Sequence, residues 1–204
     1  MNAQEILASP DFKRCVEFHG HICPGLSIGY RATKLAMERL QANRAADEEL
    51  VAIVETDACC VDAVQVLTGC TFGKGNFIYR DYGKVAFSFL SRESGRGLRV
   101  VLRPDAMPVD ERHGELMARL KDGTATPAER QEFSDRHRQK SLAVLGLDAE
   151  RLFEVKPVEV AMPAKAKVEP SENCVLCGEA VMRAKLELVA GRKICRGCRE
   201  RLGT

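Results

Sequence analysis

Apolar residues recur every three or four positions in the first part of the chain, which is the spacing of one face of an α-helix. The clearest case begins at Pro24, a residue suited to the first position of a helix. Its apolar positions are Ile28, Ala32, Leu35, Ala36 and Leu40. A shorter helix is expected over residues 62–68, where Gly69 can close it. Two more helices are expected over residues 110–121 and 127–145.

Short runs rich in β-branched and aromatic residues predict strands between these helices. The runs are residues 51–55, 77–80, 84–91 and 98–103, and the sequence ESGRG between the last two indicates a hairpin. Residues 153–160 are interpreted as a final strand at a sheet edge, because Pro157 cannot donate a ladder hydrogen bond. Helices with mostly antiparallel strands predict an α+β fold with a mixed or antiparallel sheet.

A change of composition divides the chain into parts. Residues 161–170, AMPAKAKVEP, contain Ala, Pro and Lys with few large apolar residues, and we interpret them as a linker. Residues 1–160 then form an α+β core domain, and residues 171–204 form a small second domain.

Composition and charge exclude several classes of protein. A length of 204 residues fits one ordinary domain with a small appendage. The formal net charge is +2, so binding to nucleic acid is not expected. No apolar run approaches the roughly 20 residues that span a bilayer. The N-terminus lacks the pattern of a secretory signal, and we expect a cytoplasmic protein.

Nine cysteines are many for this length, and four of them form two CxxC pairs near the C-terminus. The pairs are Cys174 with Cys177 and Cys195 with Cys198, and two such turns can complete one tetrahedral zinc site. A pair of redox dithiols is the alternative, but the strand-to-helix context usual for such motifs is missing. A domain this short cannot bury a core, so metal is expected to supply the folding energy of this zinc ribbon.

Three residues that can bind metal stand at alternate positions in FHGHICPG, namely His19, His21 and Cys23. In an extended segment such side chains project to the same side. Cys23 also precedes Pro24, at the N-terminus of the expected helix, where the helix dipole favours thiolate over thiol. Because imidazole and thiolate are ligands of zinc and related metals, we hypothesise a second metal, zinc or another transition metal, in the core domain.

A second cluster lies in DACCVDAVQVLTGC, where Cys59 stands between a strand end and a helix start. Cys70 follows that helix directly. Strand ends in mixed folds often carry ligands, so one site could gather metal ligands from both clusters. The four candidate ligands of this core site are His21, Cys23, Cys59 and Cys70.

Structural roles are the alternative to chemistry for several of these residues. A lone cysteine is usually a small buried apolar residue, as we expect for Cys15 and Cys60. His113 and His137 lie in charged helical stretches, and we expect both to be solvated. Spacing alone leaves the structural and the functional interpretation of the His/Cys cluster open.

A glycine-rich segment, GCTFGKGN, follows the second cluster. It differs from a P-loop in its first gap, and Gly75 replaces the hydroxyl that would bind magnesium, which excludes nucleotide hydrolysis. Lys74 and Asn76 could still bind a small anionic ligand together with backbone N–H groups. A plain turn between a helix and a strand is the alternative.

The segments FHGHICPG, DACCVDAVQVLTGCTFGKGN and DYGK, in this order, resemble the FmdE family. The family is named after one of the subunits of the molybdenum or tungsten formylmethanofuran dehydrogenase. The resemblance covers roughly residues 10–155, and the C-terminal module is similar to the zinc ribbon of many members. It implies an α+β domain that forms a homodimer, a cavity lined by the motif residues, often a bound metal, and an anaerobic setting. The shared positions are His19, His21, Cys23, Cys59, Asp62, Gln65, Cys70, Lys74, Asn76, Tyr82 and Lys84.

The resemblance and the residues together suggest roles for these positions. Cys23 and Cys59 would act as ligands or reactive thiols, while His19 and Asp62 would orient a ligand or move protons. Lys74 would hold an anionic substrate, and the candidates for binding a cofactor are Gln65, Lys74 and Asn76.

Three classes of function remain open at this point. The first is a metal-dependent enzyme or an accessory of an oxidoreductase. The second is metal handling, meaning delivery or sensing of molybdate, tungstate or a transition metal for a partner oxidoreductase. The third is an interaction or regulatory module built on the zinc ribbon. The resemblance names no reaction for this chain, because it implies that the molybdopterin and iron–sulfur chemistry of the dehydrogenase resides in other subunits.

Overall fold

A computed structural model describes residues 1–158 and 161–203 of the chain. These residues form two compact units, Met1–Lys165 and Ala166–Thr204. The helices of the first unit are α1 Ala3–Ala8, α2 Pro10–His19, α3 Pro24–Leu40, α4 Cys60–Thr68, α5 Glu111–Lys121, α6 Pro127–Gly146 and α7 Ala149–Leu152. Its strands are β1 Leu50–Val54, β2 Phe77–Tyr79, β3 Ala86–Ser91, β4 Gly97–Leu102 and β5 Phe153–Pro157. No helix in the described part of the chain is long and apolar enough to cross a membrane.

A five-stranded sheet forms the centre of the first unit, in the order β2-β1-β3-β4-β5. β1 pairs in parallel with β2, and the other neighbours, including the β3–β4 hairpin, pair antiparallel. This mixed sheet with its helices confirms the α+β prediction. β5 is an edge strand that contains Pro157, and the expected end of this strand at residues 159–160 lies outside the described residues.

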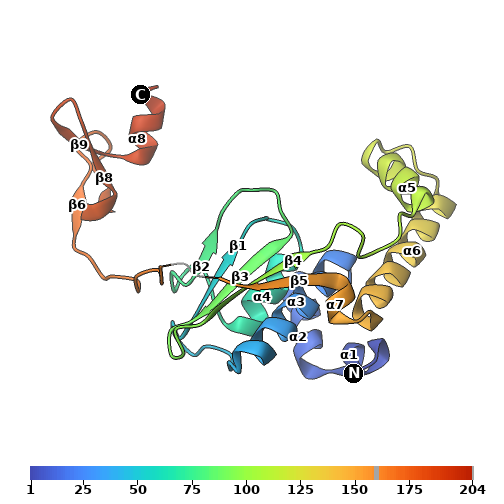
Figure 1. Ribbon diagram of the computed structural model, residues 1–204. Helices are drawn as coiled ribbons and strands as arrows, with labels where there is room; N and C mark the ends of the chain where they lie inside the picture. The colour runs from blue at the N-terminus through green and yellow to red at the C-terminus, as the bar shows by residue number, and fades with distance from the viewer. Residues whose placement is uncertain (159–160, 204) are drawn as a thin grey trace. The chain divides into compact units, whose positions relative to one another are not determined.

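One face of the sheet packs against helices (Figure 1). Ala52 and Val54 of β1 share a buried cluster with Ala32 of α3 and Val64 of α4. The two helices approach closely, because a Cβ built at Gly29 would lie only 2.0 Å from the backbone oxygen of Cys60. Gly69 closes α4 with a φ of 73°, as the sequence predicts. The sheet therefore fixes where α3 and α4 begin.

The opposite face of the sheet carries a smaller cluster formed by Val51, Ile53 and Leu90. Met162 packs against this cluster, and Arg92 donates a 2.7 Å hydrogen bond to the backbone oxygen of Pro163. The first residues of the expected linker are therefore attached to the sheet, because an apolar side chain and an arginine hold them there.

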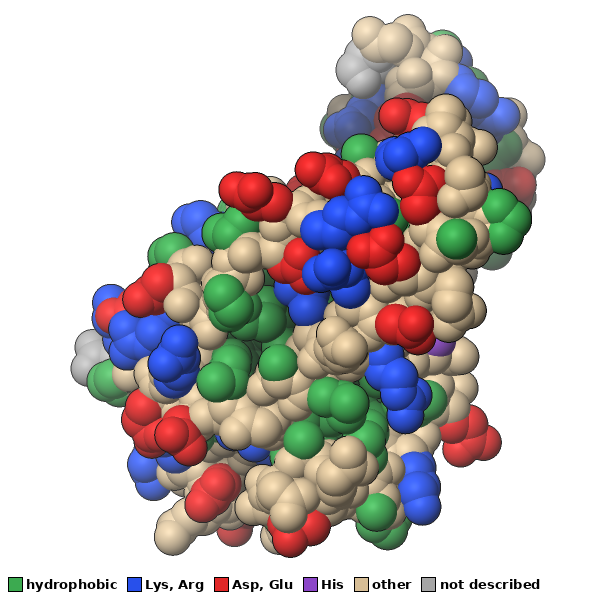
Figure 2. Space-filling model, turned by 90° about the vertical axis from the view of Figure 1, so that its right-hand side faces the viewer, with side chains coloured by type: hydrophobic (Ala, Val, Ile, Leu, Met, Phe, Trp, Pro, Cys, Tyr) green, Lys and Arg blue, Asp and Glu red, His purple; other side chains and the backbone are tan. Residues whose placement is uncertain are grey.

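Helices α5 and α6 form a hairpin that extends beyond the sheet (Figure 1), here called the α5–α6 arm. Its surface is crossed by ion pairs, including Arg112 with Glu132 at 2.8 Å and Arg119 with Glu129 at 2.6 Å. The face of the molecule in Figure 2 shows the same mixture of charges, with positive and negative side chains interspersed. The C-terminal half of α6 is anchored to the core through buried Val144 and Leu145.

The second unit contains two small hairpins and a terminal helix. They are formed by β6 Ser171–Asn173, β7 Ala180–Met182, the 3-10 turn Arg183–Lys185, β8 Leu186–Val189, β9 Arg192–Cys195 and α8 Arg196–Arg201. β6 pairs with β7 and β8 pairs with β9, both antiparallel. Its buried cluster consists of Cys174, Ile194 and Cys198, so two of the three buried side chains are cysteines.

Candidate metal centres

The four C-terminal cysteines lie around one point of the second unit, with all their sulfur atoms within 4.8 Å of one another. Cys174 and Cys177 occupy the turn between β6 and β7. Cys195 ends β9 and caps α8, where its sulfur accepts the backbone N–H of Cys198 at 3.4 Å. A turn and a helix N-terminus thus present one cysteine pair each, and the second pair opens a helix.

The donor set of this cluster fits a tetrahedral thiolate-bound metal ion. The sulfur atoms of Cys177 and Cys195 are 3.9 Å apart. Four sulfurs about 2.3 Å from a zinc ion would be separated by about 3.8 Å. Backbone N–H groups of Cys177 and Cys195 also lower the pKa of the Cys174 thiol to about 6, which favours the thiolate that metals bind.

A second group of ligand atoms lies in the first unit, at the turn between α2 and α3. The ligand atoms of His19, His21 and Cys23 all lie within 4.8 Å of one another. α2 ends at His19, and Gly20 reverses the chain with a φ of 92°. Cys23 then caps α3 and accepts the N–H of Leu26 at 3.3 Å. The helix end and helix start therefore bring together residues that are adjacent in the sequence.

Asp62 of α4 holds the ring of His19 in place. Its carboxylate lies 2.7 Å from His19 Nδ1, so the other ring nitrogen, Nε2, faces Cys23 Sγ at 3.6 Å. A carboxylate on one nitrogen and a ligand position on the other is the arrangement that orients metal-binding histidines in proteins. The structure therefore gives Asp62 a positioning contact with His19.

Cys59 stands beside this group at the N-terminus of α4, where it is exposed. A Cβ built at Gly25 would lie 3.0 Å from the Cβ of Cys59 and 3.8 Å from Cys23 Sγ, so only a glycine separates the two cysteines. Burial raises the pKa of the Cys23 thiol to about 11, which outweighs the opposite effect of the Leu26 N–H. The helix N-terminus therefore does not by itself make Cys23 a thiolate, and loss of its proton needs a bound cation.

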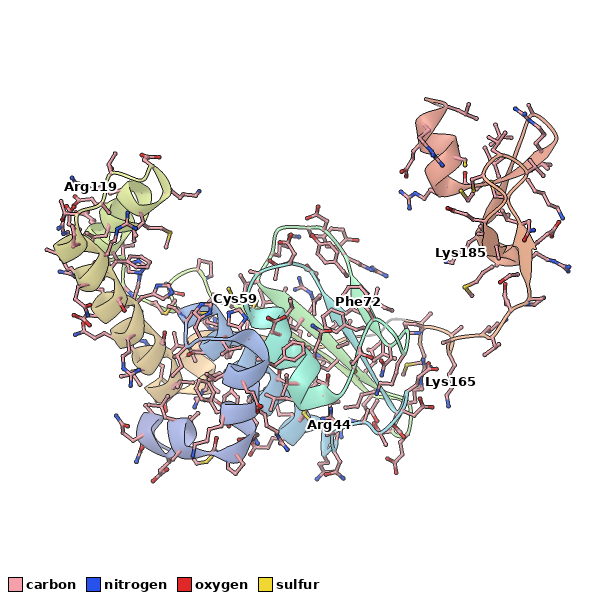
Figure 3. All side chains as sticks on the ribbon, turned by 180° about the vertical axis from the view of Figure 1, so that it is seen from behind. Arg44, Cys59, Phe72, Arg119, Lys165 and Lys185 are labelled. Atoms are coloured by element: carbon pink, nitrogen blue, oxygen red, sulfur yellow. The ribbon has the colours of Figure 1, made fainter. Side chains whose placement is uncertain are left out.

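A cavity of about 240 Å³ opens beside His21, Cys23 and Cys59. Its opposite wall is the α5–α6 arm, which contributes His113, Met117, His137 and Lys140. Figure 3 shows Cys59 on the side of the helices that faces this arm. All four histidines of the chain therefore lie in the candidate centre or in the cavity beside it.

The expectation that His113 and His137 are solvated is wrong. His113 is 5 % exposed, and its Nε2 lies 3.0 Å from Nδ1 of His137. Both rings stack on Phe133, and burial lowers the pKa of each histidine, so both favour the neutral form. The i,i+4 spacings of His113 with Met117 and of Phe133 with His137 could have indicated this semi-apolar face.

Cys70 is not part of the core centre, contrary to the prediction. It is fully buried, and its thiol lies 3.5 Å from the backbone oxygen of Leu50, at the start of β1. Cys59 precedes α4 and Cys70 follows it, so the length of that helix separates them. Arg44, which contacts the C-terminal end of α4, lies well away from Cys59 in Figure 3.

Lys74 and Asn76 bind the protein's own backbone. Lys74 donates to the backbone oxygen of Asp47 at 2.8 Å, and Asn76 donates to those of Asp47 and Leu50 at 3.1 and 2.9 Å. The Asn76 side chain is fully buried and also accepts the N–H of Thr71 at 3.0 Å. The structure thus gives both residues the role of fixing the glycine-rich turn, which was the structural alternative.

The remaining expected residues fall outside the centre. Gln65 lies one turn beyond Asp62 on α4 and lines a separate surface pocket that also includes Arg14 and Phe18. Cys15 and Cys60 are buried apolar residues, with exposed fractions of 0 % and 1 %.

The comparisons with known proteins agree with this fold. Residues 18–154 match the family model described as FmdE, molybdenum formylmethanofuran dehydrogenase operon. The chain has 26 % identity and a TM-score of 0.64 to the crystal structure of an FmdE-like protein of tungsten formylmethanofuran dehydrogenase from Syntrophus aciditrophicus. That comparison covers 95 % of this chain and 94 % of the other.

A curated relative from Archaeoglobus fulgidus has the name probable S-adenosyl-L-methionine-binding protein. It is 34 % identical over 185 residues, which cover 85 % of this chain and 49 % of the relative. The chain thus spans about half the length of that relative. Because the family model matches most of the chain, the protein belongs to the FmdE family, as the sequence motifs indicate.

Proposed function

We propose that this FmdE-family protein binds two metal ions, a structural zinc in the C-terminal module and a reactive transition-metal ion in the core. The observation that carries the core site is the convergence of ligand atoms from His19, His21 and Cys23 within 4.8 Å. The C-terminal set of four thiols is closed, which is typical of structural zinc. The core set offers three ligands and opens into a cavity, which is typical of sites that bind a further ligand.

In this proposal the side chains around the core ion have different roles. His19, His21 and Cys23 hold the ion, and Asp62 fixes the His19 ring through its 2.7 Å contact. Cys59, exposed at the cavity wall, is a further ligand or a thiol next to the ion. A transition-metal ion bound there supplies Lewis acidity toward a ligand in the cavity.

We further propose that the protein acts as an enzyme or as an accessory of an oxidoreductase, in line with the name of its family. A homodimer and association with a formylmethanofuran dehydrogenase complex are the partners that the family suggests. The many free thiols of both centres require a reducing compartment, which supports a cytoplasmic location.

Metal handling is the second candidate function, and the exposure of His21 and Cys59 supports it. Ligands that reach solvent permit an ion to be transferred to a partner. The rate of metal release to a chelator separates the two candidates. Slow release from the core site favours an enzyme, whereas release within seconds favours delivery.

Elemental analysis of the full chain tests the core site. We expect about two metal ions per chain in the purified protein and about one in the Cys23→Ala variant. Cys70→Ala is the matched control, because Cys70 is also a buried cysteine of the first unit but bonds to the Leu50 carbonyl instead. It should retain both ions. An unchanged metal content in Cys23→Ala, with loss in Cys70→Ala, would contradict the proposed ligand set.

A further inference from the structure

The cavity beside the core centre has two walls that come from distant parts of the chain. The first wall is the turn before α3 and the start of α4, with His21, Cys23 and Cys59. The second wall is the inner face of the α5–α6 arm, where His113 and Met117 project from α5 and His137 and Lys140 from α6. Residues three or four apart share one face of a helix, so each arm helix presents both of its residues to the cavity.

The electrostatic environment of this cavity is positive. Among the described residues that line it, Lys140 is the one with a full charge, and none of them is a carboxylate. In the described part of the chain, no Asp or Glu forms an ion pair with Lys140. Asp62, the nearest acidic residue of the centre, is already bound to His19. A negative group that enters the cavity therefore meets a cation without a competing anion.

Two helix N-termini add to this positive environment. α3 begins at Pro24 and α4 at Cys60, and the residues just before and at these starts line the cavity. The N-terminal end of a helix carries a partial positive charge from its unpaired N–H groups. Cys59 makes no side-chain hydrogen bond that caps α4. Both helices thus favour an anion on the same side of the centre.

The rest of the lining is apolar, with Pro24, Met107 and Met117. The volume of about 240 Å³ is below the roughly 300–1,000 Å³ of pockets that hold drug-sized ligands. The histidine pair adds hydrogen-bonding groups at the cavity wall. His137 uses Nδ1 for the contact with His113, which leaves Nε2, and the described residues make no hydrogen bond to that nitrogen. The cavity thus combines a small apolar volume with polar groups on one side.

We propose that the cavity binds a small carboxylate with an apolar body, held by Lys140 and His137 of the α5–α6 arm next to the core metal ligands. This inference rests on the proposed function and identifies the class of ligand for that same site. Lys140 pairs with the carboxylate, His137 donates a hydrogen bond from Nε2, and His113 positions the His137 ring. The apolar body lies against Met107 and Met117.

A role as further metal ligands fits His113 and His137 less well. The ligand atoms that lie within 4.8 Å of one another in the first unit belong to His19, His21 and Cys23, and the arm histidines are outside that group. They line the same cavity from the opposite side. Residues that share a cavity with the centre but lie outside its ligand cluster can contact a molecule bound between the two walls.

The test is calorimetric titration of the zinc-loaded full chain with butyrate at low ionic strength. We expect butyrate to bind more tightly than acetate, because its longer chain buries more apolar surface. Choline, a cation of similar size, should not bind. Lys140→Ala should weaken butyrate binding about tenfold, the effect of losing one charge-assisted hydrogen bond. His137→Ala should weaken it similarly, and His137→Gln should recover part of the loss because its amide retains a donor.

Lys121→Ala is the matched control, because Lys121 is an exposed lysine of the same arm outside the cavity lining. It should leave butyrate affinity unchanged. Equal affinity in Lys140→Ala and Lys121→Ala would overturn the inference. So would binding of choline or S-adenosylmethionine in preference to butyrate, because both carry a positively charged centre that would face Lys140.

Metal analysis of the same samples separates the two proposals. Butyrate binding that depends on Lys140 in a protein without core metal supports the carboxylate site and contradicts the metal site. A core that retains its metal but binds no butyrate supports the metal site and contradicts the carboxylate site. The Cys23→Ala variant, which should lose the core ion, shows whether butyrate needs the metal as well as the arm.

Discussion

The contact between Asp62 and His19 illustrates how one side chain can set the chemistry of another. His19 is part of α2 and Asp62 of α4, so this 2.7 Å contact joins two helices at the candidate centre. With Nδ1 engaged, His19 can offer only Nε2 to an ion, and that nitrogen faces Cys23. A carboxylate partner also increases the basicity of the imidazole, which strengthens its bond to a metal.

Replacing Asp62 by Asn should therefore weaken the core metal site without abolishing it. Loss of such a partner typically lowers metal affinity by about 10–100-fold. Competition with a chromogenic chelator would measure the affinity of each of the two sites in the full chain. Asp57→Asn is the control, because Asp57 is an exposed carboxylate of the preceding loop and should leave both affinities unchanged. A wild-type affinity in Asp62→Asn would show that the His19 ring is oriented by other contacts.

The individual residues also show which parts of the site the sequence could reveal. His19, His21 and Cys23 were identified because they are neighbours along the chain, and a local turn brings them together. His113 and His137 were missed because they reach the centre only through the packing of the α5–α6 arm. Cys70 was misplaced for a similar reason, since its distance from Cys59 depends on the path of α4.

The crossing of α3 and α4 is the contact between elements that brings the two cysteine-bearing helix starts together. Gly29 stands where the helices meet, and a Cβ there would lie 2.0 Å from the Cys60 backbone oxygen. A backbone atom cannot move aside as a flexible side chain can, so the helices would have to separate. The approach of α3 to α4, and with it the distance between Cys23 and Cys59, depends on this glycine.

We expect Gly29→Ala to destabilise the first unit by about 3 kcal/mol, the upper part of the usual range for overpacking in a core. Urea denaturation followed by far-UV circular dichroism would measure the change. Gly114→Ala offers a matched control on α5, because nothing lies within 4 Å of the built Cβ there. The control should stabilise the protein by about 0.5–1 kcal/mol, since alanine favours helix over glycine. Similar stability of both variants would contradict the tight crossing.

The elements themselves were well predicted where the pattern along the chain was regular. Residues 84–91 and 98–103 pair as the expected β3–β4 hairpin, and the helix from Pro24 ends at Leu40. Patterns of this kind reflect local packing against one core. The parallel pairing of β1 with β2 could not be predicted, because it depends on how the chain returns after α4.

The two units of the chain differ in what stabilises them. The first unit has two large apolar clusters, including fully buried Phe12, Tyr30, Phe87 and Phe153. The buried cluster of the second unit consists of Cys174, Ile194 and Cys198. Apolar burial alone can stabilise the first unit, whereas the second depends on whatever holds its cysteines together.

Removal of metal should therefore unfold one unit and leave the other folded. On incubation of the isotope-labelled full chain with a strong chelator, we expect amide resonances of residues 166–203 to collapse toward random-coil positions in two-dimensional NMR spectra. Resonances of the first unit should stay dispersed, with shifts confined to the surroundings of His19, His21 and Cys23, because its apolar clusters do not include a metal. Restoring zinc should restore the C-terminal resonances, since binding and folding are one equilibrium in such modules. Persistence of the dispersed C-terminal resonances without metal would mean that hydrogen bonds of the two hairpins and the Ile194 contacts suffice to fold the second unit.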